Sequence, residues 1–368
     1  MKIIICGVTG VVGQLALNVI QNENDLEIVG IVYGKNHLIA EKIILNTPEI
    51  KVYSPFDNSF NNVDSFEDML KITKPDLVIN GVSGFEGLNI SLQTIENKVS
   101  LGLANKESLV AAGWYICDYA KKNNVKIFPI DSEHSAVFDI LHNSKKTIRS
   151  ILITMSGGKY FNASQNELDL VTFNDAILHP KWNMGYKISI DSSTFMNKCY
   201  EIIEAFYLFD SKDIRVIHHP EAIIHALVEF DDSSLFAHLS QADMQLSIIL
   251  CLNFFSNKKL EIKTCVKPLS IKNLNLKLNE VDYTSIKPIS WGIEFINNKN
   301  INKAIGVILV SANDTAIELF KLNKIKYTDI VKIVDISLSA FNSYTIKNIQ
   351  DIFKLDAEIK KFINSRYL

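Results

Sequence analysis

The chain has 368 residues, of which 47% are hydrophobic, and its formal net charge at pH 7 is −3. A chain of this length is too long to fold around one ordinary hydrophobic core, so we expect two or three domains. The balanced charge argues against a nucleic-acid-binding protein, and no apolar run is long enough to span a membrane. Scattered cysteines without a C-x-x-C pair predict reduced thiols in the cytoplasm; they are Cys6, Cys117, Cys199, Cys251 and Cys265.

Short apolar runs alternate with helical patterns over residues 1–150. The first run, Ile3–Cys6, stops at Gly7, which is typical of a buried first strand rather than of a signal peptide. Strands separated by helical segments predict an α/β fold with a doubly wound parallel sheet, a Rossmann-like first domain. The expected strands are 3–6, 28–33, 77–79, 99–103 and 125–130.

The pattern changes after residue 150. Residues 151–154 predict another strand and residues 223–239 a hairpin, so we expect a central α+β domain, with its own sheet, over 151–255. Residues 256–282 are typical of a connector. Over residues 283–368 the periodicity is helical, which predicts a C-terminal helical domain.

A glycine-rich turn follows the first predicted strand, with Gly7, Gly10 and Gly13 at the spacing G-x-x-G-x-x-G. Such glycines permit a tight turn and let backbone N–H groups reach a pyrophosphate at a helix N-terminus. A generic glycine turn has the same spacing, but the strand–turn–helix context favours a dinucleotide. Because the second strand ends in Lys35 and Asn36 rather than an acidic residue, NADPH is favoured over NADH, unless Lys35 is an ordinary solvated lysine.

Two carboxylates, Asp131 and Glu133, follow the last strand of the first domain. In an extended segment, residues two apart point the same way, so both carboxylates should enter one space. A divalent cation would relieve their repulsion. The alternative is a solvated acidic loop, which this motif alone does not exclude.

A helix expected to start near Asp191–Ser192 adds a third acidic group. Asn197, Lys198 and Glu201 share one of its faces. A site made of these oxygens with Asp131 and Glu133 suits Mg²⁺ or Mn²⁺ rather than Zn²⁺. The alternative is an exposed face with a Lys–Glu pair, beside an apolar stripe of Phe195, Cys199, Ile202 and Phe206.

Two further segments carry candidate residues. Lys106 follows a predicted strand end, where it either binds substrate or simply starts a helix. Trp182 lies between Pro180 and Gly185, close to His179. An indole on such a loop suggests a lid that excludes water, although Trp182 could instead anchor the loop to the core.

Several segments and one glutamate occur in the order typical of one enzyme family: Gly7–Gly13, Gly34–Asn36, Leu103–Val110, Pro129–His134, Ser156–Gly158, His179–Gly185 and Lys187–Lys198, followed by Glu201. Together they resemble the 1-deoxy-D-xylulose 5-phosphate reductoisomerase family. The resemblance covers nearly the whole chain and fades between about Cys251 and Tyr283 and in the last helices. It implies an NADPH- and metal-dependent oxidoreductase that rearranges and reduces 1-deoxy-D-xylulose 5-phosphate to 2-C-methyl-D-erythritol 4-phosphate, in the non-mevalonate isoprenoid pathway.

The resemblance also implies roles for individual residues. The metal, Mg²⁺ or Mn²⁺ with Co²⁺ also admitted, would be held by Asp131, Glu133 and Glu201. Catalytic roles fall to those three with Lys106 and His179. Substrate contacts fall to Lys106, Ser132, Glu133, Ser156, His179, Trp182, Ser192, Asn197, Lys198 and Glu201. NADPH contacts fall to Thr9, Gly10, Val11, Val12, Gly34, Lys35, Asn36, Asn105, Glu107 and Gly185. The family further implies a cytoplasmic homodimer, with residues 151–255 carrying catalysis, dimerisation and a flexible lid.

Two residues depart from the family pattern. Val11 stands where a serine is usual, which removes a hydroxyl near the cofactor phosphates, and Met155 stands where a small residue is usual before Ser156. Two alternatives stay open at this point. One is a semialdehyde or homoserine dehydrogenase with the same N-terminal fold, and the other is a catalytically silent NADPH-binding sensor.

Overall fold

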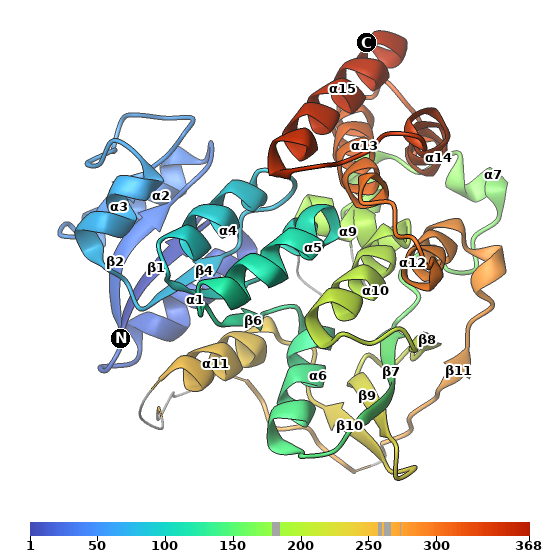
Figure 1. The fold of residues 1–368 in the computed structure, drawn as a ribbon, viewed down its shortest axis with the longest axis horizontal. Helices are drawn as coiled ribbons and strands as arrows, with labels where there is room; N and C mark the ends of the chain where they lie inside the picture. The colour runs from blue at the N-terminus through green and yellow to red at the C-terminus, as the bar shows by residue number, and fades with distance from the viewer. Residues whose placement is uncertain (179–184, 257–259, 261–265, 273) are drawn as a thin grey trace. The chain divides into compact units, whose positions relative to one another are not determined.

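The computed structural model describes residues 1–178, 185–256, 260, 266–272 and 274–368. The chain forms two compact units (Figure 1). Unit 1 comprises Met1–Asn105, Ile116–Asn143 and Asp243–Pro268, and unit 2 comprises Lys106–Tyr115, Ser144–Ala242 and Leu269–Leu368. Among the described residues, no helix combines the length and the hydropathy that crossing a membrane requires. Each unit comprises three stretches of chain. The division into domains at residues 150, 255 and 282 stays a prediction from the sequence.

Unit 1 contains the predicted parallel sheet. Its six strands are β1 (Lys2–Cys6), β2 (Glu27–Val32), β3 (Lys51–Tyr53), β4 (Leu77–Asn80), β5 (Ser100–Leu103) and β6 (Ile127–Pro129). They lie in the order β3-β2-β1-β4-β5-β6, and every neighbouring pair is parallel. The order reverses between β1 and β4, which is where open sheets of this kind bind ligands. Sequence reasoning missed β3, because only one of its three residues, Val52, is buried.

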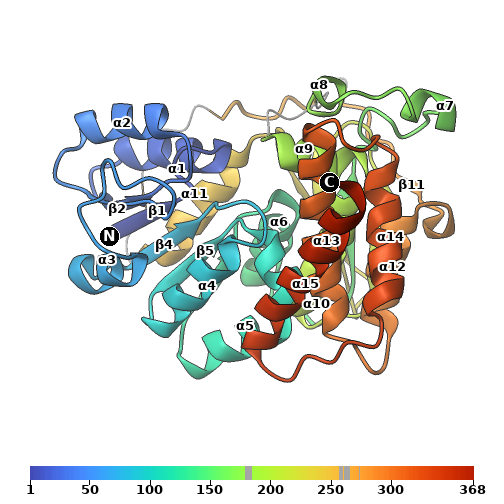
Figure 2. The ribbon, with the colours of Figure 1, turned by 90° about the horizontal axis from the view of Figure 1, so that it is seen from above.

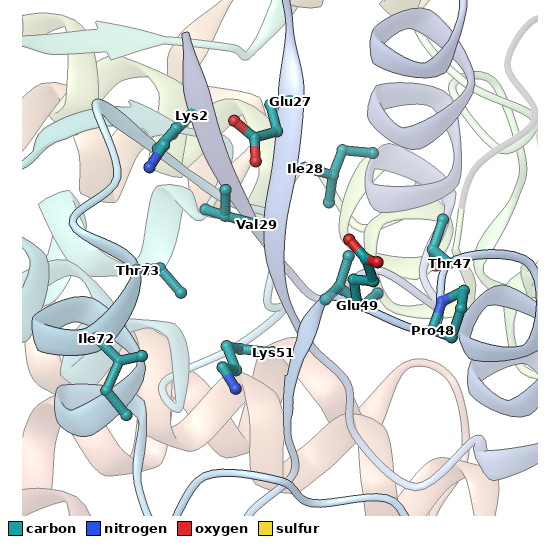
Figure 3. A pocket seen from close by; sticks show the side chains of 11 residues that line it. Lys2, Glu27, Ile28, Val29, Thr47, Pro48, Glu49, Lys51, Ile72 and Thr73 are labelled. Atoms are coloured by element: carbon teal, nitrogen blue, oxygen red, sulfur yellow. The ribbon is translucent and has the colours of Figure 1, made fainter.

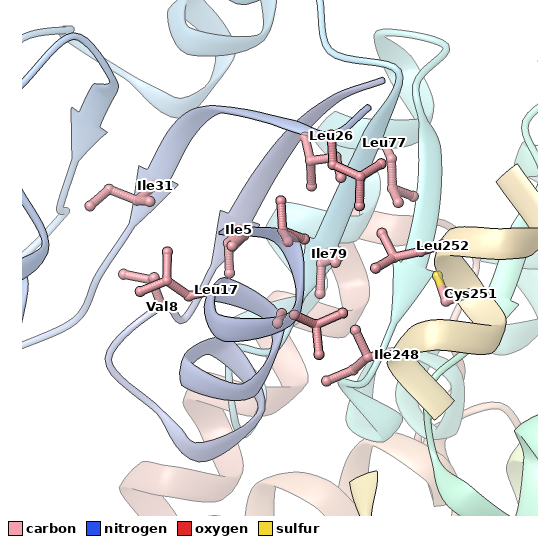
Figure 4. Packing of buried hydrophobic residues seen from close by; sticks show 14 of the residues in the cluster. Ile5, Val8, Leu17, Leu26, Ile31, Leu77, Ile79, Ile248, Cys251 and Leu252 are labelled. Atoms are coloured by element: carbon pink, nitrogen blue, oxygen red, sulfur yellow. The ribbon is translucent and has the colours of Figure 1, made fainter. Parts of the chain in front are cut away.

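Helices cover both faces of this sheet. They are α1 (Val11–Gln21), α2 (His37–Asn46), α3 (Phe66–Thr73), α4 (Gly87–Glu96), α6 (Ser132–Asn143) and α11 (Met244–Phe255). In Figure 2, α1 and α11 lie on one face and α3 and α4 on the other. Figure 4 shows Ile248 and Leu252 of α11 packed near Leu77 and Ile79, all buried in one apolar cluster. Helix α11, which comes from the segment 151–255, thus completes the hydrophobic core of the parallel sheet in unit 1.

Unit 2 has its own mixed sheet, as the sequence predicted. Its strands are β7 (Ile148–Met155), β8 (Ile214–His218), β9 (Ile224–Phe230), β10 (Leu235–Leu239) and β11 (Asn279–Glu280), in the order β10-β9-β7-β8-β11. The pair β7–β8 is parallel, whereas β9 is antiparallel to β7. The expected hairpin is confirmed as β9–β10, and Ser233 makes its turn with φ 64°.

The remaining helices belong to unit 2, apart from α5 (Lys106–Lys122), which contributes to both units. They are α7 (Gln165–Leu168), α8 (Phe173–Ala176), α9 (Tyr186–Ser193), α10 (Met196–Phe209), α12 (Lys287–Asn297), α13 (Ala304–Lys321), α14 (Asp329–Phe341) and α15 (Ile349–Tyr367), with a 3-10 turn at Tyr283–Ser285. The helical C-terminal region is confirmed, and α13 packs against both α14 and α15 (Figure 2). The helix expected near Asp191 is two helices, because Phe195 takes a left-handed conformation (φ 65°) between them.

Candidate functional site

The glycine turn is a backbone cradle that excludes side chains. Gly7 has φ +76°, and a Cβ on it would lie 2.6 Å from the carbonyl oxygen of Gly81. A Cβ on Gly13 would lie 2.3 Å from the carbonyl oxygen of Gly7, so helix α1 approaches the turn as closely as the backbone permits. Gly10 is the N-cap of α1, and no described side chain caps the helix or places an acid in its first turn. The open N–H groups and the helix dipole favour an anion there.

The end of β2 provides a second place for negative charge. Asn36 is the N-cap of α2, where its Oδ1 accepts a hydrogen bond from the backbone N–H of Ile39 at 3.4 Å. The neighbouring Lys35 is exposed, with its Nζ 5.4 Å from the ring centre of Phe56. The first turn of α2 holds no acidic residue. An exposed lysine at a helix N-terminus suits a phosphate better than a ribose hydroxyl.

Sequence reasoning missed the loop after β4, which faces the glycine turn after β1 across the switch point of the sheet. Asn80 ends β4, and its Nδ2 donates to the carbonyl of Gly87 at 2.8 Å. The Nδ2 of Asn105 donates to the carbonyls of Val82 (2.7 Å) and Gly84 (2.8 Å). The side-chain amide of Asn105, expected to touch the cofactor, therefore also holds the shape of this loop. Its signal in the sequence was Asn80-Gly81 directly after a buried strand.

A hollow at the opposite edge of the sheet is not part of this arrangement. Lys2, Glu27 and Lys51, which line it, are the first residues of β1, β2 and β3, and Ile72 of α3 closes one side (Figure 3). Parallel sheets bind their ligands at the carboxyl ends of the strands. The glycine turn and Lys35 lie at that other edge, so this hollow is separate from the candidate cofactor site.

The acidic motif was predicted as an extended segment, and this is wrong. Helix α6 begins at Ser132, which puts Glu133 in its first turn, since carboxylates there interact favourably with the helix dipole. Asp131 precedes the helix and accepts from the N–H of Ser132 at 3.0 Å, and the Ser132 hydroxyl donates to Glu133 at 2.6 Å. The fully buried His134, to which no role had been given, places its Nδ1 3.3 Å from Asp131.

The shared face of α10 holds a buried polar cluster, so its alternative, an exposed Lys–Glu pair, is wrong. Glu201 is completely buried and accepts hydrogen bonds from Asn197 and Lys198. Lys106, at the start of α5, places its Nζ 2.5 Å from Asn197 Oδ1 and 3.4 Å from Glu201 Oε1. Lys198 also donates to the carbonyl of Thr154 at 2.5 Å. Two ammonium groups and one amide thus converge on a single buried carboxylate.

A second, largely buried ion cluster centres on Lys187, for which the sequence predicted no role. Its Nζ lies 2.5 Å from Glu107, 2.7 Å from Asp191 and 3.2 Å from Asp314. Burial by itself would raise the pKa of Glu107, but Lys187 outweighs it and the pKa is lowered. Burial would likewise lower the pKa of Lys187, but the carboxylates raise it well above its usual range. The spacing of Lys187 and Asp191, one helical turn apart, was the only signal in the sequence.

The loop after β7 completes the polar side of unit 2. Gly157 and Gly158 have φ +88° and +66°, a left-handed path that glycine tolerates best. A Cβ on Gly158 would lie 3.7 Å from the carbonyl oxygen of Ser192, so this loop and the end of α9 are neighbours. Ser156 starts the loop. Lys198 donates to the carbonyl of Thr154, two residues before Ser156, so the start of this loop lies near an ammonium group, as suits a phosphate site.

Comparisons with known proteins identify the family. Family models described as 1-deoxy-D-xylulose 5-phosphate reductoisomerase, its C-terminal domain, and the DXP reductoisomerase C-terminal domain match residues 57–113, 127–209 and 239–362. The 1-deoxy-D-xylulose 5-phosphate reductoisomerase of Malacoplasma penetrans is 43% identical over 98% of this chain and 94% of its own length. The chain belongs to the 1-deoxy-D-xylulose 5-phosphate reductoisomerase family.

Further relatives agree. The reductoisomerase of Clostridium botulinum is 36% identical and matches over 98% of both chains. A solved DOX-P reductoisomerase in complex with NADPH, fosmidomycin and magnesium has a TM-score of 0.89 at 27% identity, covering 99% of this chain and 98% of that one. The Zymomonas mobilis reductoisomerase in complex with NADPH has a TM-score of 0.82 at 28% identity, covering 98% and 97%. The expected family, fold class and oxidoreductase class are confirmed, and the semialdehyde and homoserine dehydrogenase alternative is excluded.

Each unit contributes its own part of the predicted site. Unit 2 brings together Lys106, Asn197, Lys198 and Glu201, and unit 1 places Asp131, Ser132 and Glu133 at the start of α6. Thr9, Gly10, Val11 and Val12 form the glycine turn and the start of α1, Gly34 follows β2, and Gly185 is the N-cap of α9. His179 and Trp182 lie outside the described residues.

Proposed function

We propose that this chain converts 1-deoxy-D-xylulose 5-phosphate to 2-C-methyl-D-erythritol 4-phosphate, using NADPH and a divalent metal, in the non-mevalonate isoprenoid pathway. The observation that carries the proposal is the cluster of buried Lys106, Lys198 and Glu201 with partly buried Asn197, in a chain that matches the reductoisomerases along its length. Buried charges of this number are costly to a fold and are retained mainly where they serve a site.

The proposed metal ligands are Asp131, Glu133 and Glu201. Their chemistry fits a hard cation, because all three offer carboxylate oxygens, the donors that Mg²⁺ and Mn²⁺ prefer. His134, in contact with Asp131, would orient that carboxylate. When bound, the metal polarises the substrate oxygens as a Lewis acid. The magnesium in solved reductoisomerase complexes supports Mg²⁺, and Mn²⁺ or Co²⁺ are admitted by the same ligands.

The phosphate of the substrate would be held in unit 2. Ser156 and Ser192 offer hydroxyls, and Asn197 and Lys198 offer N–H donors, one of them charged. Binding at the phosphate orients the carbons that rearrange and react. Lys106 and Ser132 would contact the sugar, and His179 and Trp182, outside the described residues, would cover it as part of a lid.

NADPH would bind at the switch point of the unit 1 sheet. The glycine cradle at Gly10 and the open first turn of α1 fit a pyrophosphate, and Val11 keeps its backbone N–H although it lacks a hydroxyl. Lys35 and Asn36 fit the 2′-phosphate. Once bound, NADPH supplies the hydride for reduction. The other proposed contacts are Thr9, Val12, Gly34, Asn105, Glu107 and Gly185, of which Glu107 is already paired to Lys187.

We also propose a cytoplasmic homodimer. Strand β10 is an edge of the unit 2 sheet and exposes Leu235, Phe236 and Leu239 by 53%, 42% and 39%. Edge strands with apolar side chains are suited to pairing with another chain. Cys6, Cys199 and Cys251 are buried thiols, which suits a reducing compartment. Light scattering of the purified chain measures the mass that tests the dimer.

The deciding assay follows the absorbance of NADPH with 1-deoxy-D-xylulose 5-phosphate and Mg²⁺ or Mn²⁺. We expect oxidation that stops with EDTA and returns when metal is added in excess. A chain that binds NADPH but never oxidises it with this substrate would instead be the silent sensor. Oxidation that EDTA leaves unchanged would contradict the metal ligands.

A further inference from the structure

One histidine beside the loop after β7 has no role in the family resemblance or in the function proposed above. His218 is the last residue of β8 and is paired in register with Met155, the residue directly before Ser156. The backbone N–H of His219 donates to the carbonyl of Met155 at 2.8 Å, which fixes this register. The end of β8 is therefore held next to the start of the phosphate loop.

The ring of His218 faces that loop. Its Nε2 lies 3.0 Å from the place where a Cβ on residue 157 would stand, so any side chain there would cover the nitrogen. Because residue 157 is glycine, no side chain at this position lies over Nε2. Neither ring nitrogen of His218 has a hydrogen-bonding partner among the described residues, and the side chain is only partly buried.

An aromatic stack holds the ring in this orientation. Phe161 stacks on His218 with ring centres 4.4 Å apart and an interplanar angle of 25°. Phe161 in turn meets Phe195 edge-on, with centres 6.0 Å apart. Phe195 precedes α10, the helix that carries Asn197 and Lys198. The stack therefore joins the end of β8, the loop and the start of α10, which are the three walls of the proposed phosphate site.

We propose that His218 is a further substrate-binding residue, whose Nε2–H donates a hydrogen bond to the phosphate of the substrate. The inference rests on the proposed function, because it takes the phosphate to lie against Ser156–Gly158. It adds a donor on the wall of the site opposite Ser192, with Gly158 beside Ser192 and Gly157 beside His218. An imidazole there would favour substrates with a phosphate over the same sugar without one.

The test separates the hydrogen bond from the stack. His218→Phe keeps a ring on Phe161 but has no donor, and His218→Gln keeps a donor but no ring. His142→Phe is the matched control, because His142 also stacks on a phenylalanine, Phe138, at 6.1 Å, in unit 1. Measurements are the KM values for substrate and NADPH, inhibition by inorganic phosphate, and the melting temperature.

We expect His218→Phe to raise the substrate KM and the half-inhibiting phosphate concentration about tenfold or more, as loss of a charge-assisted hydrogen bond implies. The KM for NADPH and the melting temperature should stay unchanged, His218→Gln should recover part of the loss, and His142→Phe should match the native chain. An unchanged substrate KM in His218→Phe overturns the proposal. So does a fall in melting temperature with both KM values raised, which would make His218 purely a packing residue.

Failure of the proposed function is distinguishable from failure of this inference. If the native chain does not oxidise NADPH with the substrate, calorimetry of inorganic phosphate binding to the native chain and to His218→Phe replaces the kinetics. Weaker phosphate binding in the variant supports His218 as a phosphate donor even then. Equal binding, or none by the native chain, overturns the inference.

Discussion

Replacing Lys187 by methionine should be among the most damaging single changes to unit 2. The variant keeps a long apolar stem but removes the ammonium group that is paired with Glu107, Asp191 and Asp314. The Lys187 side chain is only 12% exposed and that of Glu107 6%, so water does not replace the lost charge. Removing one partner of a buried ion pair costs about 3–5 kcal/mol, a large part of the roughly 5–15 kcal/mol that stabilises a typical protein.

The free energy of unfolding lost in Lys187→Met should depend on pH. In the native chain, Glu107 has a pKa lowered from its ordinary 4.5, so its stabilising contribution is present above that value and fades as pH falls through the lower folded pKa. Lys187 has a raised pKa, so its contribution is present below its ordinary 10.5 and fades only as pH rises through the folded value. Without Lys187, burial pushes the pKa of Glu107 upward. The variant's deficit should therefore be large at neutral pH and shrink as the carboxylates take up protons in mild acid.

Urea unfolding at several pH values, followed by tryptophan fluorescence, measures the free energy of unfolding of the native chain and the variant. Trp114 and Trp291 both belong to unit 2 and report on its unfolding. Adding Glu107→Gln to Lys187→Met should recover part of the stability, since one uncompensated charge is gone. Lys332→Met is the control: its ammonium is 62% exposed and paired to Asp329, and solvent screening should keep the change within about 0.5 kcal/mol. A loss in Lys187→Met no larger than in this control, or one that grows in acid, would refute the reasoning.

Three further changes test the proposed site. Glu201→Gln should lower turnover more than about a hundredfold at limiting Mn²⁺, because replacing even a residue that only hydrogen-bonds to a metal ligand lowers metal affinity or activity about 10–100-fold. Near-normal turnover would show that Glu201 is not a metal ligand. Gly13→Ala places a Cβ 2.3 Å from the Gly7 oxygen and should raise the NADPH dissociation constant about tenfold or more, measured by fluorescence titration, with unchanged binding counting against the cradle. Lys35→Gln should reduce the preference for NADPH over NADH about tenfold in kcat/KM, and an unaltered ratio would show that Lys35 does not meet the 2′-phosphate.

The sequence by itself determined the features that repeat over a few residues. The apolar runs predicted the parallel sheet, apart from the three-residue β3, and the glycine spacing predicted the turn after β1. The helical period placed Asn197, Lys198 and Glu201 on one face, and hydrogen bonds now join them. These features are set by neighbours along the chain, so local pattern suffices to predict them.

Tertiary structure decided what depends on distant partners. Whether the α10 face is exposed or buried could not be known locally, because Lys106 reaches Asn197 across 91 positions of sequence. The cluster around Lys187 joins residues from α5, α9 and α13, and α11 returns to the first sheet from far along the chain. Even the start of α6 was misjudged, since a short acidic segment after a strand is compatible with extended or helical backbone. Burial and charge pairing depend on the free energy of packing these remote segments together, and the local periodicity of the sequence does not predict that packing.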